Sequence, residues 1–268
     1  MRVLVNGRTA AGIDPADRGL QYGDGLFETI AVTEGRPRFI DLHFERLAEG
    51  AKRLGLPPPE VGRFRSEIAE ACEAPRQVVK LILTRGMGER GFRPPREPRP
   101  TRIVATFAWP SWPASSWAAG VKLGWCETRC GRNKALAGIK HLNRLEQVLA
   151  RAEWDDGDWD EGLMLDDRNQ VISATQANLF ARIAGRWVTP ALDECGVAGV
   201  MRRAFRRWLE DKGEQVTVRA VARDELDAAS ALILTNALVG AWPVRELAAR
   251  TLAIHKDAGE FNAWLARQ

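Results

Sequence analysis

The residue of this chain with the clearest capacity for chemistry is Lys140, in the run GIKHLNRLEQ that spans residues 138–147. The lysine follows a glycine by two residues and opens into apolar residues at helical spacing. An amine fixed at such a junction can form a Schiff base with an aldehyde cofactor and then transfer protons. A solvated lysine at a helix start would give the same pattern. Lysine is scarce here, however, with seven lysines against thirty-two arginines.

A second candidate site is the segment Gly-Val-Ala-Gly at residues 196–199, which precedes a run with helical spacing. The first turn of a helix has backbone N–H groups without acceptors inside the helix, and the helix dipole favours negative charge there. Such a helix start can therefore bind a phosphate group. An ordinary loop with a glycine at the helix start would look the same, so both interpretations stay open.

A third candidate is the glycine-hinged loop TRGMGERGFRPP at residues 84–95. Its arginines Arg90 and Arg93 could pair with the carboxylates of a substrate, because guanidinium binds carboxylate through two parallel hydrogen bonds. A solvated surface loop is the alternative. The strong bias to arginine fits an anionic small substrate, but the base composition of the genome would produce the same bias.

Charge and composition exclude several classes of protein. The net charge is +4, and the basic residues are scattered without stacking aromatics, which argues against nucleic acid as a partner. No apolar stretch is long enough for a bilayer. Residues 1–7 predict a strand entering a turn rather than a signal peptide, so we expect a cytoplasmic protein. The four cysteines lack CxxC spacing, and neither a metal site nor a disulfide framework is predicted.

Hydrophobic periodicity and turn residues predict an α+β protein of two domains. In the first half we expect strands at 2–5, 26–32, 37–40, 77–84 and 102–107, with helices at 41–54, after an N-cap at Asp41, and at 60–72. In the second half we expect strands at 121–127, 162–165, 177–183, 186–189, 216–220 and 231–235, with helices from the lysine run to about 153 and at 199–210.

The domain boundary is predicted from a segment rich in proline, serine and tryptophan. It gives a small α/β domain at 1–108, a linker at 109–120 and a larger cofactor-binding domain at 121–268. The tryptophans Trp109 and Trp112 indicate a linker that packs against something.

Several of these segments together resemble one enzyme group. The run GRNKALAGIKHLNRLEQVL at 131–149 resembles the cofactor-lysine segment of bacterial 4-amino-4-deoxychorismate lyases. These belong to the fold-type-IV pyridoxal-phosphate enzymes, with the branched-chain and D-amino-acid aminotransferases. Shorter matches occur in the expected order: DRG (17–19), YGDGLFET (22–29), HFERL (43–47), NLF (178–180), GVAGVMR (196–202) and TNAL (235–238).

The resemblance implies a fold and a set of roles. The fold would be that of D-amino-acid aminotransferase, with pyridoxal 5'-phosphate in the crevice between the domains. Lys140 would bind the cofactor, and Arg46 would bind its phosphate. The remaining cofactor residues would be Ser173, Asn178, Gly199, Val200, Met201 and Asn236. The substrate residues would be Tyr22, Arg90 and Arg93. A homodimer is also implied, with some of the ten tryptophans buried between subunits.

The chain departs from the pattern of this group at Ser173, where members usually carry a glutamate. A carboxylate there would keep the pyridine nitrogen of the cofactor protonated and make the ring a strong electron sink. A serine hydroxyl cannot hold that proton in the same way. Transamination should suffer most, whereas loss of pyruvate from aminodeoxychorismate is partly driven by formation of an aromatic ring. If Ser173 does not face the ring, the nearest acids in sequence are Glu161, Asp166 and Asp167.

The predicted function is conversion of 4-amino-4-deoxychorismate into 4-aminobenzoate and pyruvate by a pyridoxal-phosphate lyase of folate biosynthesis. Two alternatives stay open. The first is a branched-chain or D-amino-acid aminotransferase on the same fold, for which amino acids would convert the bound cofactor into its amine form. The second is a cofactor-binding protein without catalysis, for which the cofactor would be retained with no turnover of any amine.

Overall fold

The computed structural model describes residues 1–9, 12–155 and 157–268. It divides the chain into two compact units. The first contains residues 1–110 and 139–143, and the second contains 111–138 and 144–268. The break after Pro110 falls within the segment predicted as a linker. The second unit differs from the predicted continuous domain at 121–268, because the five residues around Lys140 pair with a strand of the first unit.

The first unit is built on a six-stranded antiparallel sheet with the order β2-β1-β6-β5-β3-β4 within the described residues. Its centre is formed by β3 and β5, which pair along their length from Gly25↔Thr84 to Val32↔Gln77. The strands are β1 (Val3–Val5), β2 (Arg8–Thr9), β3 (Gly25–Thr33), β4 (Arg36–Pro37), β5 (Gln77–Thr84) and β6 (Thr101–Ala108).

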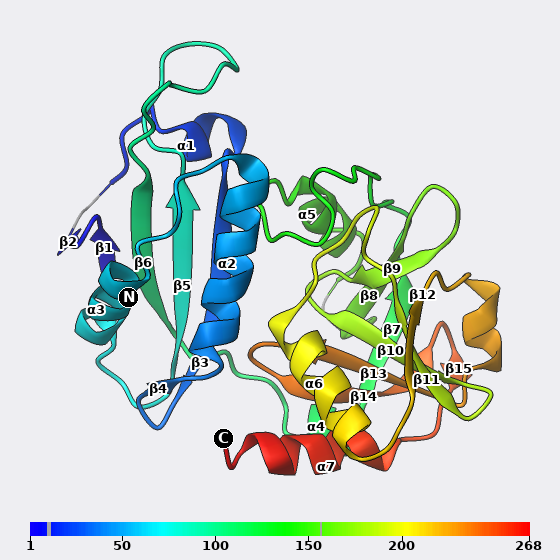
Figure 1. Cartoon of the computed structure of the whole chain (residues 1–268). Coiled ribbons are helices and arrows are strands. Elements are labelled where there is room, and N and C mark those ends of the chain that lie inside the picture. Colours follow the sequence, from blue (N-terminus) through cyan, green and yellow to red (C-terminus); the bar gives the residue numbers. More distant parts are fainter. Residues whose placement is uncertain (10–11, 156) are drawn as a thin grey trace. The chain divides into compact units, whose positions relative to one another are not determined.

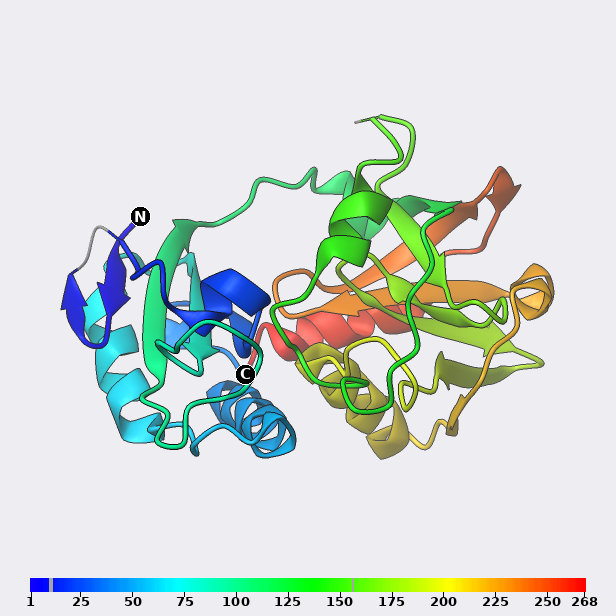
Figure 2. The same ribbon diagram turned by 90° about the horizontal axis from the view of Figure 1, so that it is seen from above.

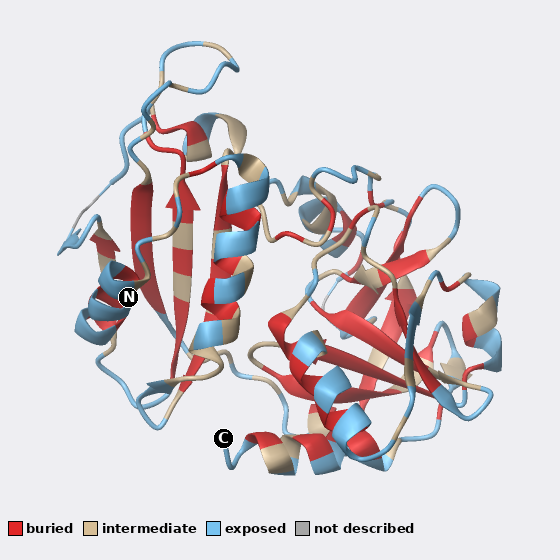
Figure 3. Cartoon of the chain, viewed as in Figure 1, coloured by how far each residue is buried: buried red, intermediate tan, exposed pale blue. Residues whose placement is uncertain are grey.

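Two long helices cover one face of this sheet, as Figures 1 and 2 show. They are α2 (Ile40–Leu54), which packs against β3, and α3 (Val61–Ala71), which packs against β6 and β1. The buried side of α2 includes Phe44 and Leu47, and its opposite side is exposed (Figure 3). A short helix, α1 (Arg18–Tyr22), precedes β3.

The start of α2 differs from the sequence prediction. Asp41 was expected as the N-cap, but it lies inside the first turn, and the N-cap is Phe39 in the left-handed conformation with φ of 51°. The predicted strand at 37–40 is wrong for the same reason. β4 ends at Pro37, and the left-handed turn at Phe39 directs the chain into the helix.

The second unit contains a nine-stranded sheet with the order β12-β11-β10-β13-β14-β7-β8-β9, to which β15 adds beside β14, within the described residues. The β11–β12, β14–β7 and β7–β8 pairs are parallel, and the others are antiparallel. The strands are β7 (Val121–Trp125), β8 (Glu161–Leu165), β9 (Val171–Ala174), β10 (Asn178–Ile183), β11 (Arg186–Pro190), β12 (Val216–Arg219), β13 (Ala231–Asn236), β14 (Gly240–Leu247) and β15 (Arg250–Thr251).

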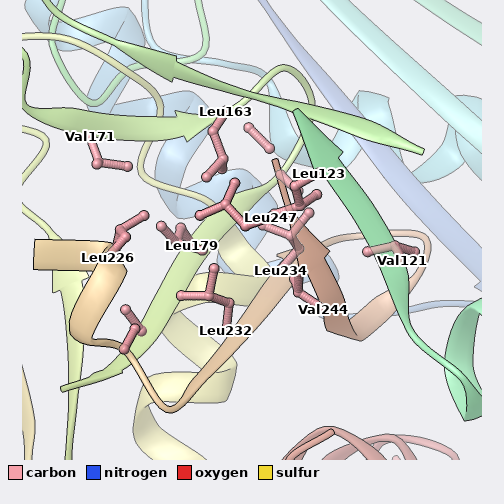
Figure 4. Packing of buried hydrophobic residues seen from close by; sticks show 14 of the residues in the cluster. Val121, Leu123, Leu163, Val171, Leu179, Leu226, Leu232, Leu234, Val244 and Leu247 are labelled. Carbon is pink, nitrogen blue, oxygen red and sulfur yellow. The ribbon is translucent and has the colours of Figure 1, made fainter. Parts of the chain in front are cut away.

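Leucine and valine side chains from these strands form the main core of the second unit (Figure 4). The helices of the unit are α4 (Ser115–Ala118), α5 (Leu145–Arg151), α6 (Val200–Asp211) and α7 (Lys256–Leu265), with a 3₁₀ helix at Asp224–Ala228. The strands β9 and β14 and the helix α7 were not predicted. β14 contains Pro243 in its interior. Because proline is rare inside sheets, this residue argued against a strand in the sequence pattern.

The tryptophans of the linker do pack, as predicted. Trp112 contacts the rings of Trp117 and Trp242, with centroids 5.6–6.2 Å apart, at the edge of the core of the second unit. Trp109 stacks with the guanidinium of Arg76 in the first unit, 4.4 Å from the ring centroid. Each end of the linker is therefore anchored to its own unit.

The helix expected to open at Lys140 begins only at Leu145. Its apolar stripe is not part of a core, because Leu145, Val148 and Leu149 are 75%, 60% and 61% exposed. Among the described residues, no helix is long and apolar enough to cross a membrane.

Candidate active site

Lys140 lies in a short extended segment that pairs with β3 of the first unit. The carbonyl of Lys140 accepts a hydrogen bond from the N–H of Phe27 at 2.9 Å, and the N–H of Leu142 donates to the carbonyl of Gly25 at 3.0 Å. An isolated bridge joins His141 to Leu26. The Nζ of Lys140 lies 4.1 Å from the ring centroid of Phe27. The backbone at Lys140 is thus hydrogen-bonded to β3, and its amine lies over an aromatic face.

Gly138, two positions before Lys140, is hydrogen-bonded to the loop at residues 196–199 of the second unit. The N–H of Gly138 donates to the carbonyl of Gly196 at 3.0 Å, and the N–H of Ala198 donates to the carbonyl of Gly138 at 2.9 Å. Gly138 has φ of 79°, in the left-handed region that glycine adopts without strain. This glycine lets the chain turn from one pairing partner to the next directly before the lysine.

A buried ionic cluster lies next to Phe27 in sequence. Glu28 accepts hydrogen bonds from Nε of Arg46 at 2.8 Å and from a second guanidinium nitrogen of the same arginine, and it contacts Nδ1 of His43 at 2.6 Å. Burial raises the pKa of Glu28, but the charge of Arg46 and the hydrogen bonds from both partners outweigh it and lower the pKa to about 2. Burial lowers the pKa of His43, so this imidazole is neutral at pH 7.

This cluster qualifies the role predicted for Arg46. One edge of its guanidinium binds Glu28, which neutralises much of its charge. The carboxylate also fixes the orientation of the side chain on α2. An anion at this position would contact an arginine that is already oriented, at the cost of weaker net attraction.

The predicted substrate residues are brought together in the first unit. The hydroxyl of Tyr22 accepts a hydrogen bond from the N–H of Gly91 at 3.3 Å, and its ring packs edge-on against Phe92 with centroids 5.4 Å apart. Arg90 and Arg93 lie on the same loop, and both are exposed. Tyr22 and the arginine loop therefore form one surface.

The segment predicted as the phosphate site lies at the start of α6 in the second unit. Gly199 is the N-cap and provides no side-chain cap, so the first-turn N–H groups of Val200 and Met201 have no acceptor within the helix. The amide of Asn178 shapes the preceding loop, donating to the carbonyl of Val197 at 2.9 Å and accepting from the N–H of Gly199 at 3.1 Å. A Cβ at Gly199 would lie 2.1 Å from Oδ1 of Asn178, so this contact requires glycine.

Asn236 has a structural role in the same unit. Its Oδ1 accepts from the N–H groups of Leu238 at 2.8 Å and Val239 at 3.1 Å, and its Nδ2 donates to the carbonyl of Gln176 at 3.3 Å. These bonds set the turn between β13 and β14 and connect it to the segment before β10.

Ser173 lies half-buried on β9, opposite Met164 of β8. Of the acids named as alternatives, Asp167 is exposed and paired with Arg132, and Asp166 caps the turn between β8 and β9. Glu161 is different. Like Asp166 it is buried, but burial raises its pKa above the ordinary value despite hydrogen bonds to Oε1 from Thr175 and the N–H of Gly162.

The second oxygen of Glu161, Oε2, is buried and has no hydrogen-bond partner within the described residues. An unpaired buried carboxyl oxygen is costly unless a ligand or a proton satisfies it. Together with the uncapped start of α6 and the amine of Lys140, it gives the chain three features that suit pyridoxal 5'-phosphate. They are an amine for the aldehyde, N–H groups for the phosphate and, if Ser173 does not face the ring, a buried acid for its nitrogen.

The chain belongs to the amino-transferase class IV family, whose model matches residues 25–247. The predicted family and fold class are thereby confirmed.

Two relatives and one solved structure are similar to this chain over most of its length. Aminodeoxychorismate lyase of Vibrio harveyi is 36% identical over 249 residues, covering 91% of this chain and 91% of that protein. The crystal structure of 4-amino-4-deoxychorismate lyase from Pseudomonas aeruginosa has a TM-score of 0.95 and 43% identity, covering 99% of this chain and 98% of that one. A putative branched-chain-amino-acid aminotransferase of Methanocaldococcus jannaschii is 26% identical, covering 98% of this chain and 93% of that protein.

Sequence reasoning gave no role to Glu28, His43 or Phe27, although all three lie in the motifs that carried the resemblance. The sequence signal for Glu28 was a glutamate within a largely apolar strand, because a buried charge needs a partner. The pairing of Glu28 with Arg46 joins a strand to a helix, and spacing along the chain does not predict it.

The acid stability of the protein should depend on Glu28. Its pKa falls from an ordinary value of 4.5 to about 2 in the fold. The unfolded chain therefore binds the proton more readily, and the stabilisation is complete above about pH 4.5 and lost as the pH falls towards 2. The shift corresponds to roughly 3 kcal/mol. Urea unfolding of Glu28→Gln between pH 6 and 3 should show lower stability at pH 6 and a flatter dependence on pH.

Glu70→Gln provides the control, because Glu70 forms an exposed ion pair with Arg2. This variant should keep the pH dependence of the unaltered protein. An equal slope for Glu28→Gln and the unaltered protein would contradict the account of Glu28.

Proposed function

We propose that this chain is a lyase that converts 4-amino-4-deoxychorismate into 4-aminobenzoate and pyruvate, with pyridoxal 5'-phosphate as cofactor. The observation that carries the proposal is the fixed amine of Lys140 within the run GIKHLNRLEQ, held by backbone hydrogen bonds to β3. The similarity to aminodeoxychorismate lyases over nearly the whole chain supports the choice of reaction.

Each residue has a defined task in this proposal. When bound, the cofactor supplies an electron-withdrawing ring. Lys140 would hold its aldehyde group, and the N–H groups of Val200 and Met201 would hold its phosphate, with Arg46 as a further cationic contact. With the substrate in the site, Nζ of Lys140 would take the proton from the substrate carbon that bears the amino group. It would then return the proton to the departing enolpyruvate.

Ser173 supports the lyase over an aminotransferase. Transamination depends on strong electron withdrawal by the ring, which requires a protonated ring nitrogen. A hydroxyl at this position supports such a proton poorly, whereas aromatisation of the product assists the lyase reaction. The cytoplasmic location stays a prediction.

Replacement of Lys140 tests the proposal most directly. Lys140→Ala should lose visible absorbance of the lysine-bound cofactor and nearly all release of pyruvate from aminodeoxychorismate, because the amine that binds and moves protons is gone. Lys134→Ala is the matched control, since Lys134 lies six residues earlier with 79% of its side chain exposed. Borohydride reduction and peptide mapping should place the label on Lys140. A label on Lys134, or no pyruvate from the unaltered protein, would overturn the proposal.

Ser173→Glu tests which group serves the ring nitrogen. A carboxylate that reaches the nitrogen should shift the cofactor absorbance and raise the slow transamination of simple amino acids, while lyase turnover changes less or falls from crowding. Stopped-flow absorbance with D- and L-alanine measures this. An unmoved spectrum would mean that Ser173 does not face the ring. Glu161→Gln should then move the spectrum, because Oε2 of Glu161 has no hydrogen-bond partner within the described residues, whereas Asp166 accepts from the backbone of its own turn.

A homodimer is the second part of the proposal. The exposed stripe of Leu145, Val148 and Leu149 on α5 supports it, because a row of large apolar side chains on one helix face favours burial against another protein surface. Leu149→Glu should shift the mass in light scattering from dimer towards monomer at micromolar concentration. The control Ile254→Glu places the same charge at another exposed apolar position. A monomeric unaltered protein would contradict this part.

A further inference from the structure

The loop at residues 88–93 folds back onto α1, and one buried side chain holds it there. Arg18 is 3% exposed. Its Nη1 donates to the carbonyls of Gly91 at 3.0 Å and Arg93 at 3.5 Å, and its Nη2 donates to the carbonyl of Phe92 at 3.0 Å. Three successive backbone carbonyls of the loop are therefore bound by a single guanidinium.

The other edge of Arg18 is fixed by Asp24. Nε of Arg18 donates to Oδ2 of Asp24 at 2.9 Å, and Arg85 binds both oxygens of the same carboxylate at 2.7 and 3.0 Å. Arg85 in turn donates to the carbonyls of Leu54 and Gly55 at the end of α2. These contacts connect Arg18, through Asp24 and Arg85, to the end of α2. The guanidinium of Arg18 is therefore held in place independently of the loop.

Tyr22 completes the attachment. The guanidinium carbon of Arg18 lies 4.8 Å from the ring centroid of Tyr22, the hydroxyl of Tyr22 binds the N–H of Gly91, and the ring of Phe92 packs against it. The beginning of the loop is secured separately, since the N–H of Gly88 donates to the carbonyl of Ala16 at 3.2 Å. In Figure 1 the loop between β5 and β6 rises beyond the end of the sheet, beside α1.

The loop itself has little else to order it. Its outward residues are exposed, with Phe92 at 83%, and it contains Gly91 at φ of 107°. A loop of this composition samples many conformations unless contacts restrict it, and ordering it at the moment of binding would weaken affinity. Contacts that order the loop before the substrate binds avoid this loss of affinity.

We propose that Arg18 is a positioning residue that sets the shape of the 88–93 loop and so presents Arg90 and Arg93 to the carboxylates of the substrate. The inference rests on the proposed function for the identity of the substrate. The clamp itself depends only on contacts within the first unit. Arg18 does not touch the substrate in this proposal and acts through the loop.

Arg18→Lys is the informative variant. Lysine keeps a positive charge beside Asp24 but lacks the planar fork that reaches three carbonyls. Limited trypsin digestion of the cofactor-loaded protein should cut the Arg90–Gly91 bond about tenfold faster in the variant, since local opening governs cleavage. The KM for aminodeoxychorismate should rise about tenfold, while kcat stays within about threefold, because ordering of the loop affects binding more than the chemical step.

Arg102→Lys is the matched control, a buried arginine of the same unit that pairs with Glu60 and Glu67. It should lower the melting temperature without faster cleavage at Arg90. Unchanged cleavage in Arg18→Lys would overturn the clamp, and faster cleavage with an unchanged KM would overturn its role towards the substrate. If the unaltered protein releases no pyruvate, the lyase proposal fails. The cleavage rates test the contacts of Arg18 with the loop in either case.

Discussion

The pairing of residues 139–143 with β3 is the constraint on which the candidate site depends. A lysine amine on a flexible surface segment would explore many positions and bind an aldehyde weakly. Here the backbone of Lys140 and Leu142 is hydrogen-bonded to the edge of β3, and Gly138 supplies the left-handed turn before it. The entropy of placing the amine is therefore lost during folding and not during catalysis.

Buried charges in each unit are arranged to orient groups more than to add stability. In the first unit Glu28 binds Arg46 and His43, and Asp24 binds Arg18 and Arg85. Burying a carboxylate costs free energy that its partners offset only with good geometry. As a result, the arginine side chains on α1 and α2 have fixed orientations. In the second unit burial raises the pKa of Glu161 above its ordinary value.

The family and most strands could be predicted from local patterns, whereas the role of Lys140 as the cofactor lysine stays a prediction. The span of β5 was predicted to the residue, because a run of mostly apolar residues ends at a threonine followed by a glycine-rich loop. The helix at the lysine was wrong because the apolar residues at helical spacing lie on a short exposed helix that begins only at Leu145. Periodicity indicates an apolar face, but it does not show whether a core or another protein surface covers that face.

The sequence by itself determined which chemical groups are available, since the run around Lys140, the glycines at 196–199 and the serine at 173 are properties of local order. Only the tertiary structure decided which groups are fixed in orientation and which have pKa values shifted by burial. Asn178 acts on a loop twenty residues later, and Arg18 binds carbonyls more than seventy residues away. Such contacts form between backbone and side chains that folding brings together, and their strength depends on burial and angle, which no spacing along the chain encodes.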